Sequence, residues 1–199
     1  MRSTITSLAF IAAATFSHAQ IELRPHIGTN IQNLTESPDG TEWTGNPGFQ
    51  AGLHVMIGNQ FFVQPGIQYV SSKSDLTSTI GGTDASFTLS TGTLRVPAVV
   101  GYRFSDPSSE PTLNLRIFGG LGMNFPMNAT FNEDGVEDVE VGSANFALTA
   151  GAGLDISIFF VEAGYDIGMT NVFDDEDFDV DAKQNQFQLN AGVRLKFAQ

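Results

Sequence analysis

The sequence QFQLNAGVRLKF, residues 186–197, alternates strictly between two kinds of residue. Every odd position from Phe187 to Phe197 is apolar, and every even position from Gln186 to Lys196 is polar or glycine. This period of two is typical of a β-strand whose two faces meet different surroundings. A strand of about 9–11 residues with one apolar face can also cross a bilayer as part of a barrel.

The same alternation recurs along the chain and predicts eight strands. We expect the other seven within residues 21–28, 49–57, 61–69, 87–104, 113–125, 146–155 and 159–169. Pro65 predicts a bulge or a local break in pairing, and a change of parity near Gly92 predicts a β-bulge in the fourth strand. Long connections at 31–46, 71–86, 128–143 and 172–184 alternate with short ones at 58–60, 105–111 and 156–158. Outer-membrane barrels show this pattern, with short periplasmic turns and long extracellular loops.

We therefore predict an all-β fold, an eight-stranded antiparallel up-and-down transmembrane β-barrel with both termini on the periplasmic side. Residues 1–19 read as a signal peptide, with Arg2, a short apolar core and a small residue at Ala19, which leaves residues 20–199 as the barrel domain. No later apolar run is long enough for a transmembrane helix. The chain has no cysteine, which excludes disulfides and thiol chemistry.

The charge balance is strongly acidic. Without Arg2 the chain carries 8 basic and 22 acidic residues, a net charge of −14. Nucleic acid is therefore excluded as a partner, because phosphate binding needs clustered lysine and arginine. Divalent cations and basic partners remain open.

Alternation alone does not decide which face of the barrel points inward, because soluble lipocalin-type barrels alternate too. The distribution of charge decides it. The polar face of the strands carries Glu22, Arg24, Arg95, Arg103, Arg116, Asp155, Glu162, Asp166, Arg194 and Lys196, whereas the apolar face carries no charge. We predict that these residues form a lumen charge network of arginine–carboxylate pairs, since eight strands leave room only for side chains and buried charges need partners.

Four segments together are similar to the PorT-like outer-membrane β-barrel family. They are FFVQPGIQYVSS (61–72), LRVPAVVGYRF (94–104), AGAGL (150–154) and NAGVRLKF (190–197). The resemblance covers nearly all of the chain after residue 19, and it implies a small barrel in the outer membrane. The family includes a component linked to protein secretion, a role that these motifs do not carry over to this chain.

The loop before the last strand is the main candidate for ligand binding. Asp175, Asp177, Asp179 and Asp181 are spaced two apart, so in an extended segment their carboxylates would share one side and could hold Ca²⁺ or Mg²⁺. The glycine and the distal glutamate of an EF-hand are missing. A solvated acidic loop, or a divalent bridge to anionic surface glycolipid, are the alternatives.

The sequence thus predicts a monomeric barrel in outer-membrane lipid, with a structural or interaction role and acidic loops that contact cations, glycolipid or a protein partner. We expect no cofactor and no enzymatic activity. His26 and His54 fall on the polar face, and no nucleophile beside them has a recognisable setting. The alternatives are a barrel enzyme that acts on envelope lipid and a soluble exported barrel that binds a hydrophobic ligand.

Overall fold

The computed structural model describes residues 20–34, 41–80, 83–105, 113–131, 144–170 and 184–197. The strands are β1 (Ile21–Leu34), β2 (Thr41–Gly58), β3 (Phe61–Ile80), β4 (Thr83–Arg103), β5 (Leu113–Phe131), β6 (Asn145–Ile156), β7 (Phe159–Gly168), β8 (Gln184–Val193) and β9 (Leu195–Phe197). The predicted signal peptide, residues 1–19, lies outside the described residues. No helix among the described residues has the length and hydropathy that a membrane crossing requires.

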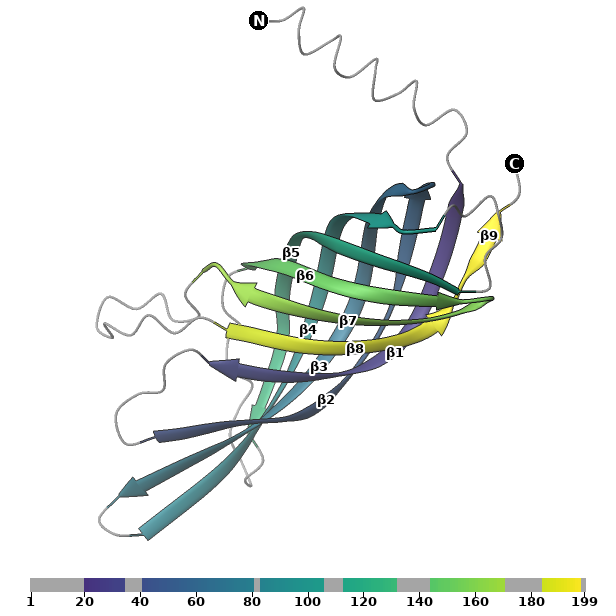
Figure 1. Cartoon of the computed structure of the whole chain (residues 1–199). Coiled ribbons are helices and arrows are strands. Elements are labelled where there is room, and N and C mark those ends of the chain that lie inside the picture. The colour runs from purple at the N-terminus through teal and green to yellow at the C-terminus, as the bar shows by residue number, and fades with distance from the viewer. Residues whose placement is uncertain are drawn as a thin grey trace, which may run out of the picture.

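The strands form one closed antiparallel barrel. Each strand from β1 to β8 pairs with the next, and β1 closes the ring by pairing with β8 as well as β2. The short β9 continues β8 after an interruption at Arg194 and pairs with the start of β1. The predicted eight-stranded up-and-down barrel is therefore confirmed, with β1 beginning and β9 ending at the same end of the barrel (Figure 1).

The barrel has a polar interior and an apolar exterior. Buried residues alternate with exposed or half-buried ones along the whole of β7, and buried residues alternate with exposed ones over residues 186–191 of β8. Leu189 on the outside is 42% exposed, whereas its neighbour Asn190 on the inside is 2% exposed. Large apolar side chains are exposed on every strand from β1 to β9, while most of the buried side chains are polar or charged. A soluble barrel with an apolar ligand cavity does not fit this arrangement.

The predicted irregularities are present, with one correction. Pairing of β3 with β4 stops after Pro65 and resumes at Gln68 in the same register, as expected for a proline in a ladder. The register of β4 and β5 shifts at Gly92, where the bulge was predicted. Gly92 pairs with Asn128 and the next residue of β4 pairs with Pro126, so the additional residue belongs to β5 rather than to β4. The short turns at 58–60 and 156–158 are confirmed.

Two of the predicted long loops are largely strand, which corrects the sequence interpretation. Residues 71–80 pair with 83–92, and residues 41–46 pair with 73–78. Serine and threonine dominate these segments and suggest a loop, but threonine is a good strand former and backbone pairing needs no apolar side chain. Figure 1 shows the three strands projecting beyond the barrel at the end opposite the termini. We call residues 41–46, 73–80 and 83–88 the hairpin extension.

Candidate functional site

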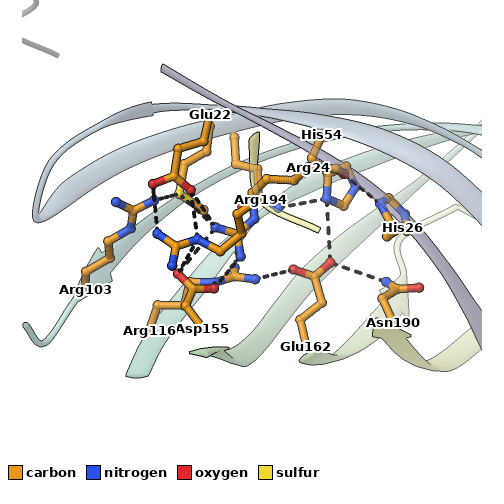
Figure 2. Close-up of polar contacts among 12 residues, drawn as sticks. Glu22, Arg24, His26, His54, Arg103, Arg116, Asp155, Glu162, Asn190 and Arg194 are labelled. Atoms are coloured by element: carbon orange, nitrogen blue, oxygen red, sulfur yellow. Dashed lines mark hydrogen bonds and ion pairs between the residues drawn. The ribbon is translucent and has the colours of Figure 1, made fainter. Parts of the chain in front are cut away.

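The lumen near the chain termini is filled by a cluster of charged side chains. We call Glu22, Arg24, Arg103, Arg116, Asp155, Glu162 and Arg194 the terminal cluster. All seven are buried, and they come from β1, β4, β5, β6, β7 and the break between β8 and β9. Figure 2 shows their guanidinium and carboxylate groups converging from different sides of the barrel. The alternation of each strand directs these residues inward, and barrel closure brings them together.

Glu22 and Asp155 are the hubs of the terminal cluster. Glu22 accepts hydrogen bonds from Arg24 (Nη1–Oε2 3.0 Å) and Arg194 (Nη2–Oε1 3.0 Å), and Arg103 Nη2 lies 2.8 Å from its Oε1. Asp155 contacts Arg24 closely, and it accepts from Arg116 (Nε–Oδ1 3.2 Å). These multiple charge-assisted contacts offset part of the desolvation that burial imposes on each ion.

Glu162 extends the cluster toward the middle of the lumen. Arg116 Nη2 donates to Glu162 Oε2 at 2.7 Å, and Asn190 Nδ2 donates to Oε1 at 3.3 Å. A separate ion pair lies farther along the lumen, where Arg95 Nη2 donates to Asp166 Oδ1 at 2.6 Å. Thr149 also donates to that oxygen, at 2.7 Å. Every carboxylate in the described lumen therefore has an arginine partner.

The two histidines contact lumen groups. His26 Nδ1 lies 3.2 Å from the backbone oxygen of Arg24. Gln64 Nε2 lies 2.9 Å from His54 Nδ1, and Glu162 Oε1 lies 3.6 Å from the same nitrogen. The two imidazole rings are 4.3 Å apart between centroids. Both histidines therefore pack against other side chains and backbone groups inside the lumen.

A small cavity lies beside His54 in the described lumen. Arg95, Glu162 and Gln188 form part of its wall, and it leaves about 20 Å³ for a water-sized molecule. That is room for roughly one water. The cavity is therefore small, and buried side chains fill the lumen around it.

Three inward phenylalanines were missed by the sequence analysis as part of this site. Arg24 lies 4.2 Å over the ring of Phe160, Arg116 lies 5.5 Å from that of Phe118, and Arg103 lies 5.8 Å from that of Phe62. Such contacts stabilise buried guanidinium groups.

Each of these rings lies opposite a glycine on the next strand. The pairs are Phe62–Gly101, Phe118–Gly151 and Phe160–Gly192, and a Cβ at any of the three glycines would overlap the ring. The sequence does contain a signal for these pairs. It is a phenylalanine at an inward position of one strand together with a glycine at an inward position of the next strand.

The predicted site residues fall into three groups. Glu22, Arg24, Arg95, Arg103, Arg116, Glu162, Asp166 and Arg194 are buried in the lumen and ion-paired, as is Asp155. Lys196 is exposed, so the structure does not bring it into the cluster. It pairs with Glu22 on the three-residue β9, at the end of the barrel where β9 pairs with β1. Asp175, Asp177, Asp179 and Asp181 lie outside the described residues, and the described residues contain no cluster of metal-ligating side chains.

Comparison with known proteins agrees with this geometry. The family of outer membrane protein beta-barrel domains matches residues 13–174, most of the chain. The chain belongs to this family. Its place is accordingly the outer membrane, where the apolar exterior of the barrel meets lipid. None of the curated proteins matches it.

Several solved structures are similar to this chain. Neisserial surface protein A is 16% identical, with 91% of this chain and all of that chain covered (100%) at a TM-score of 0.53. The Ail protein of Yersinia pestis, solved with the heparin analogue sucrose octasulfate, is 18% identical, covering 88% and 99% of the two chains at a TM-score of 0.48. The N-terminal barrel domain of Pseudomonas aeruginosa OprF is 14% identical, covering 89% and 100% at a TM-score of 0.38.

Proposed function

We propose that this outer membrane barrel has a structural or interaction role, in which the acidic end opposite the termini contacts cations, glycolipid or a protein partner. The observation that supports this most directly is the separation of charge. Among the residues that the structure describes, four of the chain's 22 carboxylates lie in the lumen. Sixteen of the other eighteen lie in residues 35–46, 73–88, 132–143 and 171–183, with only Lys73 and Lys183 as basic residues. These segments adjoin or connect the strand ends opposite the termini.

So concentrated a negative charge favours cationic partners and raises the local concentration of divalent cations. Asp175, Asp177, Asp179 and Asp181 are the proposed ligands for Ca²⁺ or Mg²⁺, since carboxylate oxygens are the donors that these ions prefer. A bound divalent cation could also bridge these carboxylates to the anionic groups of surface glycolipid. This proposal puts the acidic end outside the cell, in line with the usual orientation of long connections.

Calorimetry on the folded barrel tests the cation proposal. We expect Ca²⁺ to bind the wild-type protein and to bind more weakly when the four aspartates are replaced by asparagine. The matched control replaces Glu133, Asp134, Glu137 and Asp138 by the corresponding amides, which removes the same charge from another connection. Equal loss in both variants would indicate general charge attraction and contradict a site at residues 175–181.

The hairpin extension supports a protein partner. Pairing of β1 with β2 ends at Asn30 and Gly48, and pairing of β4 with β5 ends at Leu89 and Phe131. The outer edges of residues 41–45 and 83–88 therefore carry no strand partner among the described residues. An exposed strand edge can add a strand from another polypeptide.

Cross-linking on intact cells tests the protein-partner proposal. The wild type is compared with a variant in which a short turn replaces residues 74–88. We expect the variant to lose a cross-linked species while it keeps the gel-mobility shift of a folded barrel. A variant that folds and keeps every cross-linked species would contradict the proposal.

A non-enzymatic role is favoured because His26 and His54 contact lumen groups.

Further parts of the proposal concern maturation and kinship. We expect cleavage after Ala19, which N-terminal sequencing of the protein from outer membranes would show as a chain that begins at Gln20. We also expect a monomer in detergent. Within the outer membrane family, the segments 61–72 and 190–197 favour kinship with the PorT-like group.

A further inference from the structure

The terminal cluster contains one more positive charge than negative charge. Its arginines are Arg24, Arg103, Arg116 and Arg194, and its carboxylates are Glu22, Asp155 and Glu162. The nearest described alternative, Asp166, is already bound by Arg95, Thr149 and Gln188. Among the described residues, four guanidinium groups thus share three carboxylates in a buried site.

The surplus is localised at Arg103. Its Nη2 contacts Glu22 and the sulfur of Met56, whereas its Nε and Nη1 have no hydrogen-bond partner. Arg103 is nevertheless 0% exposed. Figure 2 shows Arg103 at one edge of the cluster, where Glu22 is the carboxylate that it meets. By contrast, Arg116 and Arg194 each reach two carboxylates.

A surplus positive charge in a buried site is unfavourable, and so are two buried N–H donors without an acceptor. A water molecule could accept from the two donors, but it would leave the charge unbalanced. An anion would meet both needs. Because the surplus is a single positive charge, a monovalent anion would neutralise it. Because Arg103 is fully buried, the anion must be small.

We propose that the terminal cluster binds one small monovalent anion, such as chloride, at Nε and Nη1 of Arg103. The anion completes the ion network at the end of the lumen near the chain termini and stabilises the closed barrel. This site is independent of the acidic end at which the proposed function lies. Failure of the anion proposal would therefore leave the proposed function untouched, and failure of the proposed function would leave the anion proposal untouched.

Thermal unfolding of the folded barrel in detergent tests the site. Sodium chloride is exchanged for sodium gluconate at constant ionic strength, and the folded fraction is read from gel mobility. We expect a saturable rise in the unfolding midpoint with chloride. At ten times the half-saturating chloride concentration, the ratio of folded to unfolded protein should rise about elevenfold, as expected when a ligand binds only the folded state.

Two variants separate the site from general screening. Arg103→Gln removes the surplus charge, and we expect it to abolish the chloride response. Lys196→Gln removes an exposed cation at the same end of the barrel and should keep the response. Equal stability of the wild type in chloride and gluconate would overturn the proposal. A carboxylate of the connection 106–112, which contains Asp106 and Glu110, would then be the better candidate for the missing charge.

Diffraction provides a readout that does not depend on folding of the Arg103 variant. In crystals of the wild-type protein grown in bromide, an anomalous peak within hydrogen-bond distance of Arg103 Nε or Nη1 would confirm the site. Ordered bromide elsewhere, with none at Arg103, would overturn it.

Discussion

The two halves of the lumen are built from different chemistry. The half near the termini holds the terminal cluster with three phenylalanine rings against its arginines. The half toward the hairpin extension is lined mainly by neutral side chains, among them Asn30, Gln32, Gln50, Ser72 and Gln186, and it holds the single Arg95–Asp166 ion pair. There Ser72 donates to Asn30 (2.9 Å) and Gln50 donates to Asn190 (2.5 Å).

This difference indicates where the stability of the barrel resides. In the charged half every carboxylate has at least one arginine partner and Glu22 and Asp155 have several, so removal of one ion leaves others buried without a partner. In the other half, which we call the neutral half, the hydrogen bonds away from the Arg95–Asp166 pair join uncharged groups, whose net contribution is smaller. We infer that the end near the termini holds the barrel closed and that the opposite half tolerates variation.

The largest effect is expected at Asp155. Asp155→Ala leaves Arg24 and Arg116 without their shared carboxylate, and removal of one partner from a buried ion pair costs about 3–5 kcal/mol. Urea unfolding of the folded barrel, read from gel mobility, measures the loss. Asp155→Asn is the control for side-chain volume and should also destabilise strongly. A loss no larger than that of the neutral-half variant below would remove the distinction between the halves.

A smaller effect is expected where a phenylalanine covers a glycine. Gly151→Ala places a Cβ against the ring of Phe118 and the backbone, and such overpacking costs about 1–3 kcal/mol. The same unfolding assay applies. Gly119→Ala on the neighbouring strand is the matched control, because its Cβ would make only an ordinary contact with Thr149. If both variants were equally stable, the fit between ring and glycine would have no energetic role.

In the neutral half, Asn30→Ala removes the acceptor of the Ser72 hydroxyl and a contact to the backbone of Ser71. A hydrogen bond between neutral groups contributes about 1 kcal/mol. The unfolding midpoint in urea should therefore fall less than for Asp155→Ala. A loss equal to that of the charged residue would show that both halves are equally important for closure.

The smallest effect is expected at Lys196. Its side chain is exposed, and substitutions at such surface positions usually change stability by less than about 0.5 kcal/mol. The Lys196→Gln variant should therefore have the same unfolding midpoint in urea as the wild type. Marked destabilisation would indicate that Lys196 belongs to the lumen charge network after all, as its position in the strand alternation predicts.

Strand polarity could be predicted because it is a local property. The parity of Gln188, Asn190 and Arg194 is enough to place them inside, and the structure buries all three. Lys196 has the same parity but is exposed, because parity does not report where a strand runs past the end of the barrel. The serine-rich residues 71–80 were mistaken for a loop, since their pairing partners lie on other strands.

By itself, the sequence determined the all-β class, the number of strands that form the barrel, the direction of each face and the placement of most charges on the inner face. Alternation and composition carry this information along each strand. Only the tertiary structure decided which ions meet. Glu22 and Arg194 are 172 residues apart, and Arg24 and Asp155 are 131 apart. Their contacts depend on strand register and closure, which are properties of the whole barrel.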